Sequence, residues 1–378
     1  MQLEFKAIAH FLIAPVYLLG SLLLFSCYPT PLGESGDESV DSSELTLGTE
    51  LTEEIDRLVA ASLRHNGPGV AVLIIDRGAI FQKGYGLGQV VEQRPITPDT
   101  VFDLASVSKQ MTALGILRLM EAGKLELEDA VMEHLPDFED PDPDNPIVIR
   151  DLLNHTSGLA DYTGEAWQET DEAFARLTIE DHLQWLNQQE IESDRGVEFE
   201  YNNSGYALLA LIIERISGQS FGAFMAEQIF TPLGMNNTVV FGDLDQQIPN
   251  RAEGYAVSPQ GDVEPSSFPS VIAGDGNIFS SIADLVRYDQ GLRNGDLVTP
   301  ATLKLAFTPG TLDDGESFPY GLGWEISPDY VEHRGSWYGT STFYRHYTQV
   351  PVTIIVLAND ENYPVDKLVD DLARLLRD

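Results

Sequence analysis

Cysteine is nearly absent from the sequence: Cys27 is the single one in 378 residues. A chain with one cysteine forms no internal disulfide and holds no cysteine-based metal site. If Cys27 carries a lipid, the mature protein also has no thiol for catalysis. No other residues have the spacing of zinc ligands, so we expect neither a metal nor any other cofactor.

Basic residues are scarce. The sequence holds 22 lysines and arginines against 60 aspartates and glutamates, a formal net charge of -38 at pH 7. Such a charge repels the phosphates of nucleic acids and of anionic membrane surfaces, so we expect neither as an electrostatic partner. Hydrophobic residues make up 43% of the chain. This is enough for a chain of this length to bury a large core, so the acidity belongs to the surface of a folded protein.

Long apolar runs are missing apart from residues 11–25, which follow Lys6. This run has the length of a signal-peptide core and is short for a membrane span. It ends at Ser26-Cys27 and resembles a bacterial lipoprotein signal, which implies a signal segment at 1–27 with Cys27 as the lipid attachment site. The resemblance implies an exported protein of the bacterial cell envelope, held to a membrane by its N-terminal lipid anchor on the periplasmic or extracellular side. An uncleaved anchor and ordinary secretion are the alternatives.

The remaining pattern predicts a linker and one folded domain. Residues 28–48 are rich in Pro, Gly, Ser, Asp and Glu and predict a flexible acidic linker, after which residues 49–378 fold. Periodicity predicts helices at 51–63, 106–122, 149–154, 179–188, 204–216, 220–229, 281–292 and 365–376. Alternation predicts strands at 70–75, 79–85, 320–326, 330–336, 340–349 and 352–358. We therefore predict an α/β (α+β) fold in three layers, whose antiparallel sheet from 49–105 and 294–378 is flanked by helices and interrupted by a mostly helical insertion at 106–293.

Ser106 and Lys109 form the first pair with chemical meaning. They stand three residues apart at the start of an expected helix, so their side chains share one face. Serine becomes a nucleophile when another group takes its proton, and a lysine one turn away can lower the local pKa or act as the base. N–H groups at a helix start also favour an anion formed there. A capping serine before an exposed lysine is the ordinary alternative, and this pair alone does not decide between the two.

Two later stretches favour the chemical interpretation. Tyr201-Asn202-Asn203 leads from a polar loop into an apolar helix, and His333-Arg334-Gly335 lies on an expected strand. Together with Ser106-Val107-Ser108-Lys109 they resemble the S-x-x-K, Y-x-N and H-x-G set of the class C β-lactamase-like serine hydrolases, relatives of the penicillin-binding proteins. The resemblance covers residues 49–378 and includes the stretches 152–159, 232–235 and 320–324. It implies a β-lactamase/transpeptidase-like fold with the site between the sheet part and the helical insertion.

The resemblance implies acyl transfer. Ser106 is then the nucleophile, while Lys109 and the phenol of Tyr201 share its proton and return it to the leaving group. A phenol needs cationic neighbours to act as a base at pH 7, and we expect Lys109, with His333 if protonated, to supply them. Asn203 is expected to hold Lys109 and to grip a substrate amide.

Substrate contacts are expected from the strand that carries His333. The resemblance implies an oxyanion hole made by the backbone N–H groups of Ser106 and Ser336, and substrate contacts from Arg334 and Gly335. Family members that act on β-lactams or D-alanyl peptides often have a hydroxyl residue at the position of Arg334, where it helps to bind a carboxylate. Arg334 either replaces that hydroxyl by pairing with a carboxylate or points away from the site.

The acyl substrate stays open, because an ester, a D-amino-acid peptide and a β-lactam all present the same carbonyl to Ser106. We expect a small-molecule or peptide acyl substrate and a serine hydrolase of the β-lactamase, D-alanyl-D-alanine carboxypeptidase or esterase type. A carboxylesterase is the second enzyme hypothesis. The hypothesis of another class is a penicillin-sensing or scaffolding protein that keeps the fold without turnover.

Other motifs are interpreted as structural. Gly218-Gln219-Ser220-Phe221-Gly222 matches the nucleophile elbow of α/β-hydrolases, but a helix precedes it, so we expect Gly218 to end one helix and Ser220 to cap the next. His155 is also expected to be structural. Four aspartates resemble part of an EF-hand loop but lack its turn glycine and are expected to form an acidic surface loop: Asp140, Asp142, Asp144 and Asp151.

Overall fold

The computed structural model describes residues 46–163, 175–268 and 270–377. The expected signal segment at 1–27, with Cys27, and all but the last three residues of the expected linker lie outside these ranges. Among the described helices, none alone has both the length and the apolar character needed to cross a membrane. Helix α7 (Asn203–Ser217) and the following segment Phe221–Leu233 meet those criteria only jointly, with a bend of 77° between them.

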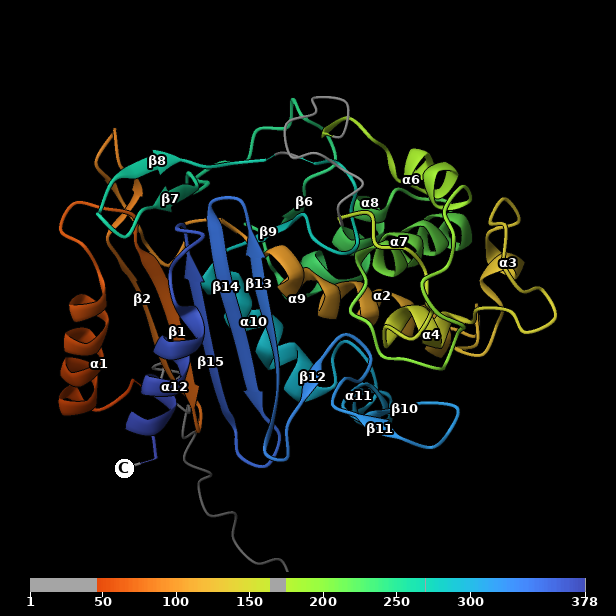
Figure 1. The fold of residues 1–378 in the computed structure, drawn as a ribbon. Helices are drawn as coiled ribbons and strands as arrows, with labels where there is room; N and C mark the ends of the chain where they lie inside the picture. Colours follow the sequence, from red (N-terminus) through yellow and green to blue (C-terminus); the bar gives the residue numbers. More distant parts are fainter. Residues whose placement is uncertain (1–45, 164–174, 269, 378) are drawn as a thin grey trace, which may run out of the picture. The chain divides into compact units, whose positions relative to one another are not determined.

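A six-stranded sheet lies at the centre of the fold, in the order β12-β13-β14-β15-β1-β2 (Figure 1). Its strands are all antiparallel to their neighbours: β1 (Val70–Asp76), β2 (Ala79–Tyr85), β12 (Glu325–Ile326), β13 (Tyr330–Trp337), β14 (Thr340–Tyr347) and β15 (Val352–Ala358). β1 and β15 are aliphatic and buried along nearly their whole length, as is typical of strands covered on both faces. They pair from Val70↔Ala358 to Asp76↔Val352, which joins the two ends of the domain. The prediction of one sheet interrupted by a helical insertion is confirmed, although the strand expected at 320–326 is regular only at Glu325–Ile326.

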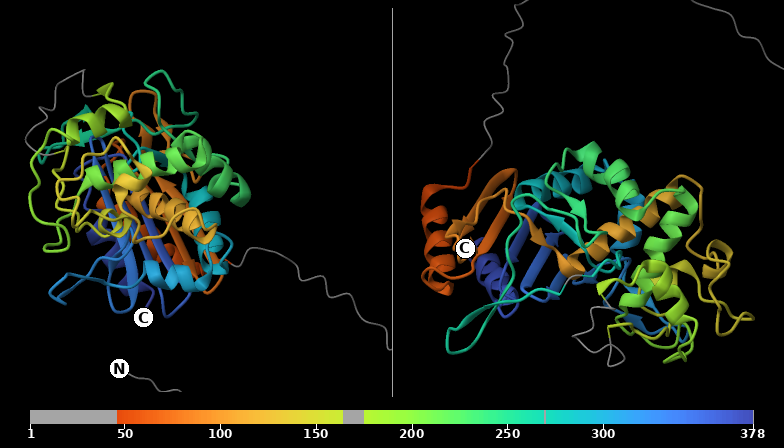
Figure 2. Two further views of the ribbon diagram at one scale, coloured as in Figure 1. Left: turned by 90° about the vertical axis from the view of Figure 1, so that its right-hand side faces the viewer. Right: turned by 90° about the horizontal axis from the view of Figure 1, so that it is seen from above.

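Helices cover both faces of this sheet and give the three layers (Figure 2). On one face α1 (Thr49–Ser62) and α12 (Val365–Leu375) pack on Val72 and Ile74 of β1. On the other face Leu73 and its neighbours in the sheet belong to the core shared with the 3-10 turn η1 (Ala105–Val107), α2 (Ser108–Glu121) and α10 (Ile282–Asn294). The alternation of side chains along β1 therefore divides the core into two clusters, one on each side of the sheet.

The insertion is built around α7, whose residues from Ser204 to Ile213 are all buried. The other helices among the described residues of this part of the fold are α3 (Val131–His134), α4 (Ile149–Leu153), α6 (Ile179–Leu186), α8 (Phe221–Met225), the π-helical turn η2 (Ala226–Phe230) and α9 (Thr231–Leu233), and α11 (Pro300–Ala306) follows α10. α2 packs against α7 and so links the insertion to the sheet face. The helix expected at 220–229 is divided between α8 and η2.

Short strands account for most of what the sequence pattern did not predict. They are β3 (Leu87–Gln89), β4 (Arg94–Pro95), β5 (Phe102–Asp103), β6 (Val239–Val240), β7 (Tyr255–Val257), β8 (Val263–Pro265), β9 (Ile278–Ser280), β10 (Gly310–Thr311) and β11 (Ser317–Phe318). Two or three residues are too few to show a periodicity, so such strands leave no signal in the sequence. One of them matters for the site: β5 pairs with β9 and fixes the chain just before Ser106.

Candidate active site

Ser106 lies in a tight turn between a strand and a helix. β5 ends at Asp103, and Ala105 has a φ of +46°, a left-handed conformation in which its N–H donates to Asp103 Oδ1 at 2.8 Å. The expected helix at 106–122 therefore begins as η1 and becomes α-helical at Ser108. The two serines of this stretch, Ser106 and Ser108, lie in different environments. Ser106 is half-buried and lines a cavity, whereas Ser108 is fully buried and its Oγ accepts the Ile278 N–H.

Lys109 is completely buried one turn after Ser106. Its Nζ lies 3.3 Å from Ser106 Oγ, 2.7 Å from Asn203 Oδ1 and 2.9 Å from the backbone oxygen of Asp275. A buried amine without partners is costly, and these three oxygens satisfy it on three sides. The spacing in the sequence placed Ser106 and Lys109 on one face, and the structure brings their side chains together.

Asn203 faces Lys109 because another residue caps the helix. The N-cap of α7 is Asn202, whose side chain accepts the Gly205 N–H at 2.8 Å, so the side chain of Asn203 is not needed as a cap. Asp161 Oδ2 accepts both the Asn203 N–H at 2.7 Å and an Nδ2–H at 3.0 Å. Because a carboxylate only accepts, it directs the amide nitrogen to itself and the amide oxygen to Lys109.

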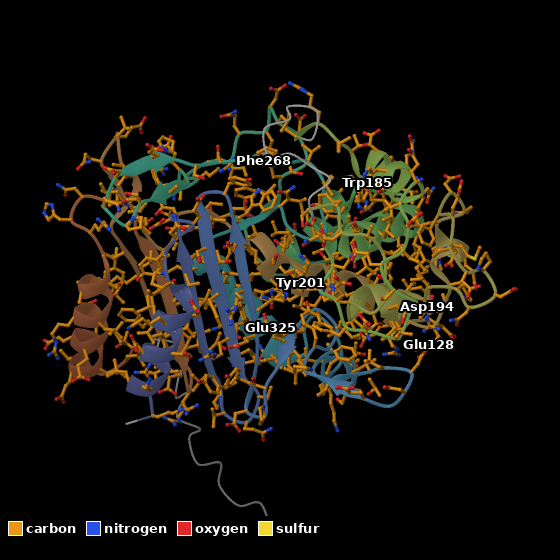
Figure 3. The ribbon with its side chains drawn as sticks, in the orientation of Figure 1. Glu128, Trp185, Asp194, Tyr201, Phe268 and Glu325 are labelled. Carbon is orange, nitrogen blue, oxygen red and sulfur yellow. The ribbon has the colours of Figure 1, made fainter. Side chains whose placement is uncertain are left out.

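Tyr201 stands at the entrance of the site, between the sheet and the helices (Figure 3), with 38% of its surface exposed. The centroid of its ring is 4.8 Å from Lys109 Nζ. Its ring also lies 4.4 Å, centroid to centroid, from that of His155, which is buried and accepts the Asn202 N–H on Nδ1. His155 therefore supports both Tyr201 and the start of α7, consistent with the structural role expected for it.

His333 is buried beside this aromatic group, 6.1 Å from Tyr201 between ring centroids. Burial, with a smaller contribution from the charge of Lys109, lowers the pKa of His333 to about 3. Its Nδ1–H donates to the backbone oxygen of Arg334 at 2.7 Å, and its Nε2 accepts from the Tyr320 hydroxyl at 3.0 Å. The ring is therefore neutral at pH 7, so the condition under which His333 was expected to supply a second cation, its protonation, is not met because the residue is buried.

Strand β13 presents alternate residues to the site. A Cβ on Gly335 would lie 2.4 Å from the Leu104 oxygen and 3.1 Å from Ala105 Cβ, so Gly335 permits close packing of β13 against η1. Arg334 is exposed on the opposite face of the strand, with Nη1 3.9 Å from Asp366 of α12. The structure therefore does not bring Arg334 to the site, because neighbouring side chains of a strand point to opposite faces. By the same alternation the Ser336 side chain shares the face of Arg334, but Ser336 stands near the end of β13, where it lines the cavity.

A cavity of about 250 Å³ opens in front of Ser106. The residues that line it and carry chemistry are Asp103, Ser106, Tyr201, Asn203, Asp275 and Ser336. Burial raises the pKa of Asp103 to about 6, and burial also raises the pKa of Asp275, opposed by the charge of Lys109. The structure thus brings Ser106, Tyr201, Asn203 and Ser336 to one opening, with Lys109 beneath them.

Sequence reasoning missed three acidic residues of this site: Asp103, Asp161 and Asp275. Asp161 precedes the helix that it orients by about forty residues, and nothing in the sequence distinguishes it from the other aspartates. Asp275 lies between two glycines, a pattern that indicates an unusual backbone conformation at this position. The pattern does not indicate which residues Asp275 contacts. Only the folded arrangement brings these residues to Ser106.

The remaining motifs are structural. Gly218 ends α7 with a φ of +70°, and Ser220 caps α8 by accepting the Ala223 N–H, as expected. The side chains of Asp140, Asp142 and Asp151 accept hydrogen bonds from backbone N–H groups, one of them the N–H of Asp144, and Asp151 also pairs with Arg195. The expectation of an acidic surface loop is wrong for Asp140 and Asp151, which are buried. Within the described ranges, no three His, Cys, Asp or Glu side chains are grouped as metal ligands.

Comparisons with known proteins agree with this architecture. The sequence profile of the family described as Beta-lactamase matches residues 55–378. Penicillin-binding protein 4* of Bacillus subtilis (strain 168) is 35% identical over 321 residues, which cover 79% of this chain and 69% of that protein.

Solved structures show the same fold. The octameric penicillin-binding protein homologue from Pyrococcus abyssi superposes with a TM-score of 0.74 at 28% identity, over 86% of this chain and 77% of that one. The D-amino acid amidase from Ochrobactrum anthropi SV3 has a TM-score of 0.74 at 22% identity, over 87% of this chain and 99% of that one. At that identity the second likeness is one of fold.

Proposed function

This chain belongs to the beta-lactamase family of serine hydrolases, and we propose that it hydrolyses an ester or amide through an acyl-enzyme on Ser106. The observation that carries the proposal is the position of Lys109 Nζ, 3.3 Å from Ser106 Oγ and held on its other sides by Asn203 Oδ1 and the Asp275 backbone oxygen. Both of these oxygens can only accept hydrogen bonds, so each of them takes one N–H of Lys109. The remaining bonding position of the nitrogen faces the Ser106 hydroxyl.

Lys109 suits proton transfer in both directions. When neutral, it has two N–H bonds for the two fixed acceptors and a lone pair for the Ser106 hydroxyl proton. When protonated, its third N–H donates back to Ser106 Oγ. The same geometry serves both states, so the proton moves without rearrangement of the site.

Acylation follows from these contacts. Ser106 Oγ bonds to the substrate carbonyl carbon while its proton passes to Lys109, and the negative oxygen formed is held by the backbone N–H groups of Ser106 and Ser336. Tyr201 lies beside Lys109 and faces the cavity, so its phenol relays the proton to the leaving group. Water then attacks the acyl-enzyme by the reverse proton path and releases the acid. His333 contributes hydrogen bonds and no charge, because it is neutral.

The test is covalent labelling. The protein is incubated with a fluorophosphonate and, separately, with a labelled penicillin, and the adduct is located by peptide mass spectrometry. We expect an adduct on Ser106 that is lost in Ser106→Ala and kept in Ser108→Ala, the matched control two residues away. Folded protein without an adduct on Ser106 from either reagent would refute the mechanism.

The same experiment separates the substrate hypotheses. Labelling by the fluorophosphonate alone, with turnover of short-chain nitrophenyl esters, favours a carboxylesterase. Stable penicillin labelling without turnover favours a penicillin-sensing protein.

The proposed export and lipid anchor rest on residues 11–27 of the sequence. Labelled palmitate should be incorporated into the wild-type protein but not into Cys27→Ala.

A further inference from the structure

The segment that leads to Tyr201 carries most of the exposed large hydrophobic side chains of the described residues. There are six such side chains, and four of them lie in residues 191–201: Ile191, Val197, Phe199 and Tyr201. A lone exposed apolar side chain is ordinary, whereas a contiguous exposed patch is typical of a binding surface. The segment 191–201 therefore calls for a ligand, and its position at the site indicates which one.

Phe199 and Tyr201 form one continuous aromatic surface. Phe199 lies 6.1 Å from the ring of His155 and 5.7 Å from that of Tyr320, centroid to centroid. Tyr201 lies 4.4 Å and 6.3 Å from the same two rings. His155 and Tyr320 are buried, whereas Phe199 and Tyr201 are each 38% exposed. The two outer rings thus rest side by side on the same support, and Phe199 also stacks on Phe318 of β11 at 4.9 Å.

The backbone around Phe199 is fixed from two sides. The N–H of Glu200 donates to the backbone oxygen of His155 at 2.9 Å. The backbone oxygen of Gly196 accepts the Asp313 N–H at 2.9 Å. An apolar group that settles on a surface held in this way does not have to order the surface first, so more of its contact energy appears as binding.

Tyr201 determines which part of a substrate meets this surface. In the proposed function its phenol passes the proton to the leaving group, so the leaving group lies against Tyr201. Tyr201 lines the cavity in front of Ser106, while Phe199, two residues before it, lies outside that cavity. The surface of Phe199 therefore begins where a leaving group at Tyr201 emerges from the cavity.

We propose that Phe199, supported by Phe318, forms a leaving-group subsite that takes apolar alcohol or amine groups. The inference rests on the proposed function and names the class of its leaving group. The acyl group bonds to Ser106 inside the cavity, so Phe199 should affect the choice of leaving group and not the choice of acyl chain. Full burial of one CH₂ group changes binding about fourfold, and contact with one flat ring covers about half of that group, so we expect about twofold per CH₂.

Two series of simple esters test the subsite. In the first series the acyl group is acetyl, and the alcohol is lengthened from ethyl to butyl and hexyl, which have nearly equal pKa values. In the second series the alcohol is ethanol, and the acyl group is lengthened from acetyl to butyryl and hexanoyl. We expect kcat/KM of the wild type to rise about 10- to 20-fold from ethyl to hexyl acetate. In Phe199→Ser this rise should nearly disappear, while the dependence on acyl chain length should stay as in the wild type.

Two further variants separate the subsite from general damage. Phe199→Leu keeps an apolar side chain and should retain most of the preference for the hexyl ester. Val91→Ala shortens another exposed apolar side chain, in the turn between β3 and β4, and should leave both series unchanged. Labelling of Ser106 by the fluorophosphonate shows that each variant is folded.

The outcomes separate this inference from the proposed function. Equal kcat/KM values across the acetate series, an unchanged rise in Phe199→Ser, or an equal loss of acyl-chain dependence in that variant overturns the subsite while acyl transfer stands. Failure to turn over both hexyl acetate and N-hexylacetamide, by protein that the fluorophosphonate labels on Ser106, has the same meaning. Absence of labelling on Ser106 overturns the proposed function itself.

Discussion

Replacement of Asp161 by alanine should reduce activity through a residue that touches no reacting atom. Asp161 is half-buried, and its Oδ2 accepts both the N–H of Asn203 and one N–H of its side-chain amide. Its Oδ1 accepts the Thr163 N–H at 2.7 Å. The Asn203 amide also donates to Thr163 Oγ1 at 3.0 Å, but a hydroxyl can donate as well as accept, so without the carboxylate the amide oxygen is held less firmly towards Lys109.

The magnitude follows from the contact that is lost. The bond between Asn203 Oδ1 and Lys109 Nζ, 2.7 Å long, involves a charged group when Lys109 is protonated. Hydrogen bonds to charged groups contribute about 1.5–3 kcal/mol. At about 1.4 kcal/mol per tenfold change in rate, we expect Asp161→Ala to lower kcat/KM by about 10- to 100-fold.

A double-mutant cycle distinguishes positioning from general damage. The kcat/KM values of Asp161→Ala, Asn203→Ala and the double variant are compared, with Asp194→Ala as a control that removes an exposed acid of the insertion. If Asp161 acts through Asn203, the double variant is no slower than Asn203→Ala. Additive losses, or full activity in Asp161→Ala, would refute the reasoning.

Three further changes probe the same arrangement. Gly335→Ala places a Cβ 2.4 Å from the Leu104 oxygen, so we expect a destabilisation of about 1–3 kcal/mol in urea unfolding and slower labelling of Ser106; wild-type values for both would contradict the packing argument. His182 is buried, and burial lowers its pKa to about 4. In the unfolded chain its pKa is about 6.5, so below that pH unfolding is accompanied by uptake of a proton. The free energy of unfolding therefore decreases as the pH falls from about 6.5 towards 4. Carboxyls with raised pKa, such as Asp103, act in the opposite direction. The effect of His182 is therefore measured by comparing two proteins. Between pH 7.5 and 5 the free energy of unfolding should fall further in the wild type than in His182→Phe, and equal decreases would contradict this role of His182. Arg334→Ala should keep kcat/KM within about twofold, since the side chain lies outside the site; a tenfold loss would show that Arg334 reaches substrate.

The sequence pattern predicted the long strands of the central sheet because their composition and turns are set by neighbouring residues in the chain. β1 and β15 are aliphatic except for Asp76 and Thr353, and β13 and β14 are separated by a turn at Gly339, so their strand character is visible without any neighbour. The start of α2 was displaced by only a short turn, because Ala105 adopts a left-handed conformation that the sequence does not announce. The short strands had no periodicity to detect, yet β5 and β9 hold the chain before Ser106.

The site was predictable only where chemistry and spacing coincide. Ser106 and Lys109 share a helix face, so their contact follows from the sequence. The neutral state of His333 depends on its burial beside Tyr320, and burial of one strand residue is a tertiary property. Only folding brings Asp161 to Asn203 and the Asp275 backbone oxygen to Lys109, and in a chain with 60 acidic residues no pattern selects these two.

The most direct measurement of the central claim is the trapping of the acyl-enzyme. The protein is mixed with isobutyric acid p-nitrophenyl ester, quenched in acid during turnover and digested for peptide mass spectrometry. The account predicts an isobutyryl group on Ser106, accumulation of that adduct when water attack is slowed in Tyr201→Phe, and no adduct in Ser106→Ala. Turnover by Ser106→Ala at the wild-type rate, or an acyl group carried by another residue, would contradict it.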